Sequence, residues 1–165
     1  MADPVDAALQ AKVLTVSDGV VAGTRQDKSG KALVAALVAA GWEVVEHRVT
    51  ADGAEAVAAA LEALAEDFSG LVVTTGGTGF APRDLTPEGT RAVIDREAPG
   101  LAEAMRLANP EKGRLSRGVA GTIGCTIVIN TPGSQAGSVE SLDAVIDVLA
   151  HAVALLGDRP TAHPK

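Results

Sequence analysis

The polar residues of this chain gather at four points, each of them directly after a predicted strand. They are Ser17 and Asp18, then residues 50–52, 75–84 and 130–134, and these are the densest clusters of Gly, Ser, Thr and Asp in the sequence. Exposed backbone N–H groups and hydroxyls bind phosphate. Four such clusters at one edge of a sheet would suit a phosphorylated small molecule.

The run Thr75-Gly76-Gly77-Thr78-Gly79 is the clearest of these clusters. Glycines at three of four successive positions let backbone N–H groups approach an anion without interference from Cβ atoms. The threonine hydroxyls add further donors. A tight strand-to-helix turn alone would require one glycine rather than three, so the run favours an anion-binding loop.

The other polar residues have two interpretations each when only their spacing is considered. Asp84 is either a functional carboxylate or a local cap or turn partner, and Asp52 is either functional or the N-cap of the next helix. Pro132-Gly133-Ser134 could form only a turn, but its position beside the other loops favours ligand contact. Arg117 could be an ordinary surface charge.

The elements that position these residues alternate between strands and helices. Apolar patterning predicts strands at 12–17, 42–49 and 71–75, and a hairpin over 119–130 that turns at Gly124. Helices are predicted at 28–40 and after Asp52, the second with an apolar stripe that includes Phe68. Another is predicted to begin at the N-cap Thr86, another to end at Leu107, and one last helix to reach residue 156. Residues 18–27 and 109–113 are predicted loops. This order predicts a three-layer α/β/α fold with a mostly parallel sheet plus a small hairpin, in which ligands bind at the carboxyl ends of the strands.

Composition limits the class of protein further. The chain has 165 residues, of which 47% are hydrophobic and 2% aromatic, and its formal net charge is −7. We expect one folded domain over 11–157, with an arm at 1–10 and a tail at 158–165. An acidic chain with few aromatic rings is not expected to bind nucleic acid or an anionic membrane. The single Cys125 lies in an apolar run, which predicts a core position, and the three histidines lack metal-ligand spacing. No long apolar span or secretory signal is present, so a cytoplasmic location is expected.

At these clusters the sequence resembles the MogA/MoaB family, the molybdopterin-binding domain of molybdenum cofactor biosynthesis. The resemblance extends over about residues 12–156. It is carried by residues 15–18 (TVSD), 27–30 (DKSG), 74–90 (TTGGTGFAPRDLTPEGT), 97–100 (EAPG), 115–118 (LSRG) and 129–134 (INTPGS). The combination of GGTG, PRD-x-TP and N-x-PGS in this order is highly specific.

The resemblance implies an activity and a set of site residues. Active members transfer AMP from ATP to the terminal phosphate of molybdopterin with Mg²⁺, giving adenylylated molybdopterin and pyrophosphate. Their two important carboxylates align with Asp52 and Asp84, which are therefore expected to be catalytic, to hold Mg²⁺ and to orient the α-phosphate of ATP. The predicted substrate-binding residues are Ser17, Asp18, Thr75, Gly76, Gly77, Thr78, Gly79, Ser116, Arg117, Pro132, Gly133 and Ser134.

The resemblance also implies a homotrimer and a possible hand-over of the product to a molybdate-inserting protein. A paralogue that holds the pterin without catalysis is the alternative function, and the presence of both Asp52 and Asp84 favours the enzyme. Asn109 is a departure from the family pattern, because a serine that touches the ligand often occupies its place.

Overall fold

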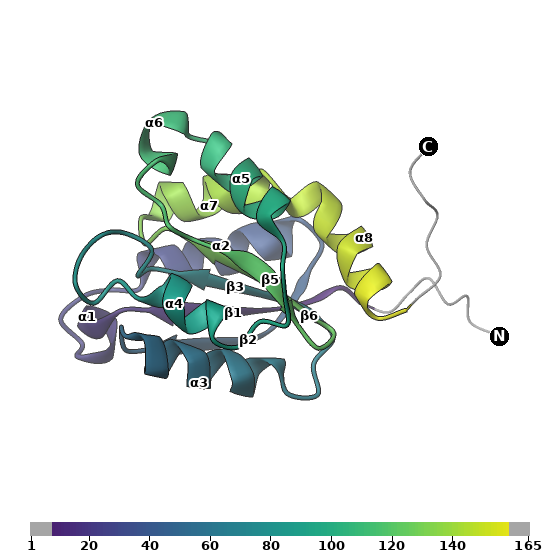
Figure 1. Ribbon diagram of the computed structural model, residues 1–165, viewed down its shortest axis with the longest axis horizontal. Helices are drawn as coiled ribbons and strands as arrows, with labels where there is room; N and C mark the ends of the chain where they lie inside the picture. Colours follow the sequence, from purple (N-terminus) through teal and green to yellow (C-terminus); the bar gives the residue numbers. More distant parts are fainter. Residues whose placement is uncertain (1–7, 159–165) are drawn as a thin grey trace.

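The computed structural model describes residues 8–158, and its centre is a six-stranded sheet in the order β2-β1-β3-β6-β5-β4 (Figure 1). The strands are β1 (Gln10–Val16), β2 (Glu43–Thr50), β3 (Gly70–Thr75), β4 (Arg96–Glu97), β5 (Ala120–Ile123) and β6 (Thr126–Thr131). Strands β2, β1, β3 and β6 are parallel, whereas β5 runs antiparallel to both β6 and β4. The predicted mostly parallel sheet and its hairpin are confirmed.

Helices cover both faces of this sheet (Figure 1). One face carries α2 (Lys28–Ala39), α5 (Pro99–Leu107), α7 (Gln135–Asp143) and α8 (Ile146–Leu156), and the other carries α3 (Ala54–Ala65) and α4 (Thr86–Arg91). The short helices α1 (Asp18–Val21) and α6 (Pro110–Gly113) lie within the loops that follow β1 and α5. The molecule is therefore a three-layer α/β/α fold.

Strand β3 lies in the middle of the sheet and is buried along its whole length. Leu71 and Val73 belong to the core cluster beneath α2, α5, α7 and α8, whereas Val72 belongs to the cluster beneath α3. Successive side chains of a strand point to opposite faces. A strand covered on both faces therefore consists of apolar and small residues throughout, as the sequence predicts for 71–75.

Several predicted element boundaries are wrong. The last helix is two helices, because Val145 has φ −130° and ψ −11° and interrupts the helical hydrogen bonding between α7 and α8. The predicted loop 109–113 contains α6, which Asn109 caps by accepting the Lys112 N–H. The predicted loop 18–27 likewise contains α1, capped by Ser17. Phe68 is buried but lies beyond the end of α3.

The predicted core position of Cys125 is also wrong, because this residue is exposed at the turn between β5 and β6. The hairpin turns beside it at Gly124, as predicted, with φ +54°. Gln10, at the end of the predicted arm, already pairs with Glu43 in the sheet, while residues 1–7 of the arm and 159–165 of the tail lie outside the described residues. No helix within the described part of the chain is long and apolar enough to cross a bilayer.

Candidate functional site

A cavity of about 1140 Å³ opens at the carboxyl edge of the parallel strands, where the chain leaves β1, β2, β3 and β6. All four polar clusters found in the sequence contribute to its wall. The predicted site residues that line it are Ser17, Asp52, Thr75, Gly76, Gly77, Thr78, Gly79, Asp84, Ser116, Pro132, Gly133 and Ser134. Asp18 and Arg117 are the two predicted substrate-binding residues that do not line it.

Contacts within the protein also require glycine at two positions of residues 75–79, which we call the glycine loop. Gly76 and Gly77 have φ of +99° and +68°, which L side chains rarely adopt. A Cβ on Gly76 would collide with the carbonyl oxygen of Val16, and one on Gly77 would collide with the hydroxyl of Thr86. That hydroxyl donates to the carbonyl oxygen of Gly76 at 2.9 Å. Thr86 therefore holds the loop, and its predicted role as the N-cap of α4 is wrong, because the N-cap position is Leu85.

Asp52 stands between α1 and the glycine loop. Its Oδ2 accepts the backbone N–H of Asp18 at 2.8 Å, and its own N–H donates to Asp18 Oδ1 at 3.1 Å. The N-cap of α3 is Gly53, with no side-chain capping bond, so the capping interpretation of Asp52 is wrong. No group in residues 8–158 donates to Asp52 Oδ1, which lies near Gly77.

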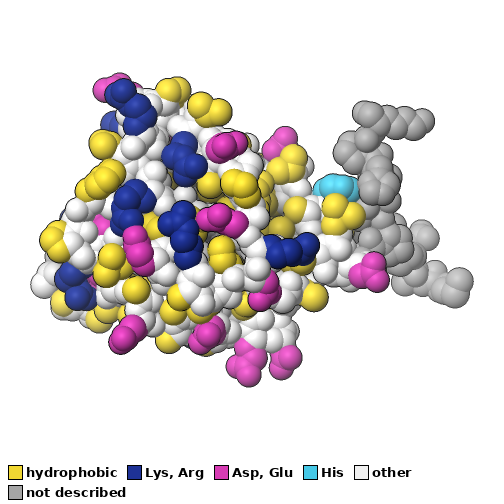
Figure 2. All heavy atoms as spheres, viewed as in Figure 1, with side chains coloured by type: hydrophobic (Ala, Val, Ile, Leu, Met, Phe, Trp, Pro, Cys, Tyr) yellow, Lys and Arg dark blue, Asp and Glu magenta, His cyan; other side chains and the backbone are white. Residues whose placement is uncertain are grey.

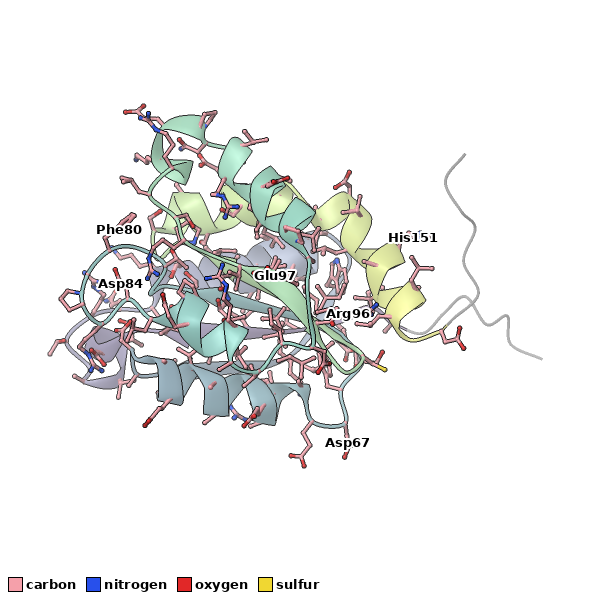
Figure 3. The ribbon with its side chains drawn as sticks, in the orientation of Figure 1. Asp67, Phe80, Asp84, Arg96, Glu97 and His151 are labelled. Carbon is pink, nitrogen blue, oxygen red and sulfur yellow. The ribbon has the colours of Figure 1, made fainter. Side chains whose placement is uncertain are left out.

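Asp84 lies on the loop between β3 and α4, as Figure 3 shows together with Phe80. Its Oδ2 accepts the N–H of Ala81 at 3.0 Å. Asp84 is therefore a turn partner, which is one of the two interpretations that its spacing allowed. Its other oxygen has no donor in the described part of the chain. The turn therefore orients the carboxylate and leaves one oxygen for a ligand.

Arg83 ties this loop to α1. Its Nε donates to Asp18 Oδ2 at 2.6 Å, and its Nη2 donates to Asp18 Oδ1 at 3.1 Å and to the carbonyl oxygen of Asp52 at 2.8 Å. The bonded guanidinium lowers the pKa of Asp18 below its ordinary value. Asp18 thus positions Asp52 and pairs with Arg83, whereas the sequence predicted that it binds substrate.

Arg117 supports the same loop from behind. Its Nε donates to the carbonyl oxygen of Gly79 at 2.8 Å, and its Nη2 donates to that of Asp84 at 2.5 Å. It also pairs with Glu88, and this bond lowers the pKa of the Glu88 carboxyl. All of these contacts are to protein groups, so the geometry makes Arg117 a support of the loop.

The two carboxylates fit a magnesium ion only in company with a ligand. Residues 8–158 contain no group of three or more His, Cys, Asp or Glu side chains that could hold a metal by themselves. Mg²⁺ in phosphate sites is usually bound by one or two carboxylates together with substrate phosphates and water. Asp52 and Asp84 line one cavity and each has an oxygen without a donor, so they fit an ion that arrives with a nucleotide.

Two walls of the cavity were given no role by the sequence analysis. One comes from α5 and the residue after it, with the apolar Ala102, Met105 and Ala108 and the basic Arg106. The other comes from the start of α2, with Arg25, Lys28 and Ser29. The first wall could have been recognised from the helical spacing of apolar residues in 99–107. The second could have been recognised from Asp27, which lies three residues before Gly30 and caps α2. Asn109 also lines the cavity, and its side-chain amide donates to Glu140 at 3.3 Å.

The face of the molecule drawn in Figure 2 carries charges of both signs. Figure 2 shows lysine and arginine side chains interspersed with acidic ones over the face that it draws. Because both signs are present, binding of an anion in the cavity would depend on which cations line it and which are paired elsewhere.

Comparison with known proteins identifies the family. The family model described as "Probable molybdopterin binding domain" matches residues 12–151, which hold every predicted site residue. The chain belongs to this family. Among solved structures, it resembles the molybdopterin biosynthesis enzyme MoaB of Thermus thermophilus, with a TM-score of 0.85 and 44% identity; the match covers 92% of this chain and 98% of that one. The similarity to the MogA/MoaB family expected from the motifs is thereby confirmed.

Curated relatives differ in length. A molybdopterin adenylyltransferase of Helicobacter pylori is 35% identical over 150 residues, which are 87% of this chain and 85% of that protein. The molybdenum cofactor synthesis protein cinnamon of Drosophila melanogaster is 43% identical over 91 residues, which are 53% of this chain. The present chain spans only 15% of cinnamon and 47% of a bifunctional molybdenum cofactor biosynthesis protein of Chlorobaculum tepidum.

Proposed function

We propose that this protein acts in molybdenum cofactor biosynthesis, where it transfers AMP from ATP to the terminal phosphate of molybdopterin. The products are adenylylated molybdopterin and pyrophosphate. One observation carries the proposal: Asp52, Asp84 and the glycine loop, which come from separate strand ends, line a single cavity. The relative named molybdopterin adenylyltransferase, which this chain matches over most of its length, supports the same reaction.

The proposed chemistry needs no nucleophile from the protein. An oxygen of the molybdopterin phosphate attacks the α-phosphorus of ATP, the bond from that phosphorus to the bridging oxygen breaks, and its electron pair leaves with pyrophosphate. Such a transfer depends on alignment of the reacting groups and on neutralisation of their charge. Magnesium bound with the nucleotide would supply much of that neutralisation.

The residues of this chain divide the remaining tasks between them. The free oxygens of Asp52 and Asp84 would hold the metal and so fix the position of the α-phosphate. The buried Thr78, whose hydroxyl has no partner in residues 8–158, would add a donor to the pterin phosphate on the glycine loop. Arg83 and Arg117 would keep the loop in place through the contacts described above.

The direct test is incubation of the purified protein with molybdopterin, ATP and Mg²⁺, followed by detection of adenylylated pterin and pyrophosphate. We expect both products in equal amounts, and neither when molybdopterin or Mg²⁺ is omitted. Binding of molybdopterin without either product would contradict the proposal and favour the non-catalytic, pterin-binding function. The homotrimer, the cytoplasmic location and the hand-over to a molybdate-inserting protein stay predictions.

A further inference from the structure

Ser29 is a polar residue without a polar partner in the wall of the cavity. It is 8% exposed and lines the cavity at the second position of α2. No group in residues 8–158 forms a hydrogen bond with its hydroxyl or with its backbone N–H. The oxygen of this hydroxyl is open to the cavity rather than fully buried, so water or a ligand can satisfy it. Ser29 therefore offers a hydrogen-bond donor to a ligand with acceptor atoms.

The start of α2 favours a negatively charged ligand. This helix has 12 residues, and its first turn carries the partial positive charge of a helix N-terminus. The cap Asp27 also lines the cavity, but both of its oxygens are hydrogen-bonded within the protein, so this carboxylate has no oxygen without a partner. Oδ1 accepts the Gly30 N–H at 2.9 Å, and Oδ2 lies 2.7 Å from the Thr15 hydroxyl and 2.9 Å from His47 Nε2.

Two basic side chains next to Ser29 add to this preference. Arg25 and Lys28 are exposed and line the cavity, and neither forms an ion pair with any residue of 8–158. Arg83 and Arg117, by contrast, are both committed to carboxylates of the protein. Arg106 and Lys112 also line the cavity without an ion pair among residues 8–158, but they lie at α5 and α6, whereas Arg25 and Lys28 lie beside the N-terminus of α2 and the Ser29 hydroxyl.

The wall at α5 offers a flat ring a more suitable surface than the start of α2 does. Ala102, Met105 and Ala108 present apolar surface to the cavity on the side of α5. Rings bury their faces on apolar side chains, whereas phosphates bind N–H groups, hydroxyls and cations. The wall at α2 has the second kind of chemistry.

We infer that Arg25, Lys28 and Ser29 form a subsite for the β- and γ-phosphates of the nucleotide. This inference rests on the proposed AMP transfer and names the place where its leaving group is held. When the bond between the α-phosphorus and the bridging oxygen breaks, the electron pair and the negative charge pass to pyrophosphate. Donors at the start of α2 would stabilise that charge as it develops.

The test is calorimetric titration of the full chain with inorganic pyrophosphate, with ATP and with AMP, in magnesium buffer and without molybdopterin. We expect Ser29→Ala and Lys28→Ala each to weaken pyrophosphate and ATP binding by about tenfold, as loss of a hydrogen bond to a charged group does. AMP has no β- or γ-phosphate, so its affinity should change by less than about twofold. Lys31→Ala is the matched control, because Lys31 is exposed on the same helix and does not line the cavity.

The subsite is wrong if pyrophosphate fails to bind the wild-type protein, or if both variants bind it normally. An equal loss in Lys31→Ala would also overturn it, since that result would reflect general charge. The readout is independent of turnover. If AMP transfer is absent but pyrophosphate binding depends on Ser29 and Lys28, the subsite stands and the proposed reaction falls. If transfer occurs but both variants bind pyrophosphate normally, the reaction stands and the subsite falls.

Discussion

The guanidinium of Arg117 binds the backbone of Asp84, not the cavity: its Nη2 donates to the Asp84 carbonyl oxygen at 2.5 Å. The same side chain holds the Gly79 carbonyl oxygen and pairs with Glu88. One arginine thus fixes both ends of the segment that carries Phe80, whose ring is 71% exposed and lies 5.8 Å from the guanidinium. The position of the Asp84 carboxylate depends on a residue that the sequence predicted to be a substrate ligand.

Arg117→Ala should therefore separate catalysis from pterin binding. We expect AMP transfer to fall about 100-fold, the size of effect that a misplaced catalytic group produces. Molybdopterin affinity should fall much less than the rate, because Arg117 does not line the cavity and its side chain holds the glycine loop only at the Gly79 carbonyl oxygen. Arg117→Lys should recover only part of the rate, since lysine cannot hold two acceptors in a planar fork.

Arg91→Ala is the control for this experiment, because Arg91 pairs with Glu97 at the surface. Single-turnover rates and pterin titrations on the three variants provide the measurement. A large loss of pterin affinity in Arg117→Ala, with a normal rate at saturation, would return Arg117 to the role of a substrate ligand.

The charge of Asp18 makes the stability of the folded protein depend on pH. Its pKa is lowered in the folded protein by Arg83, so its contribution to stability is present above the unfolded value of about 3.9 and is lost as the pH falls through the lower folded value. We expect Asp18→Asn to be less stable than the wild type at pH 7, and the difference to close between about pH 4 and the folded pKa.

Urea unfolding of both proteins from pH 7 to pH 3 measures this difference. High salt should shrink it at pH 7, because the pair Asp18–Arg83 is largely exposed. A stability difference that stays constant down to pH 3 would show that the charge of Asp18 contributes nothing.

Two residues of the glycine loop, Gly77 and Gly79, should respond differently to substitution by alanine. Gly77→Ala should destabilise the fold, because φ is +68° and the new Cβ would meet the Thr86 hydroxyl. Gly79 has no such φ, and its Cβ would lie 2.9 Å from Asp84 Oδ2, the end of a side chain that can move. We expect Gly79→Ala to fold with nearly normal thermal stability and to lose AMP transfer. Normal transfer by Gly79→Ala would mean that Asp84 tolerates displacement.

Gly30 tests the packing under α2. A Cβ there would lie 2.5 and 2.6 Å from the two carboxylate oxygens of Asp27, and in collision with Thr15. Gly30→Ala should cost about 1–3 kcal/mol of unfolding free energy, as overpacking does. Gly100→Ala, in open space in the first turn of α5, should instead be neutral or stabilise the fold by about 0.5 kcal/mol. Equal stabilities in denaturant unfolding would contradict the tight contact at Gly30.

The sequence could predict the parts of this molecule that local pattern decides. Strand β3 alternates between two core clusters, so every position from Leu71 to Val73 must be apolar, and the turn at Gly124 requires a residue that tolerates positive φ. The strand-end clusters followed from these strands, since parallel strands end at one edge.

The parts that were mispredicted depend on tertiary contacts. Thr86 precedes a proline and has the pattern of an N-cap, but its hydroxyl bonds a carbonyl ten residues earlier in the chain. The helix break at Val145 could not be predicted from a Gly or Pro, because neither residue is present there. The type of a charged residue does not say where it points. Asp18 and Arg117 form ion pairs that support the loop and lie outside the cavity wall, and their contact with substrate stays a prediction. Cys125 has apolar neighbours, yet the hairpin turn exposes it.

In the proposed reaction, Asp52 and Asp84 serve catalysis together. Substituting either by asparagine keeps the shape of the side chain and removes the charge that would hold the metal. The control is Asp143→Asn, because Asp143 is exposed at the end of α7 and does not line the cavity. The double variant should be scarcely worse than either single one, since each loss already disables a shared site.

The decisive experiment measures single-turnover AMP transfer to molybdopterin on Asp52→Asn and Asp84→Asn, together with their thermal stability and pterin affinity. We predict that each variant loses transfer by at least about 100-fold, while pterin affinity is unchanged or slightly tighter because a negative charge is gone. Normal turnover per folded molecule, with only a lowered stability, would contradict the account and leave a protein that binds molybdopterin without adenylylating it.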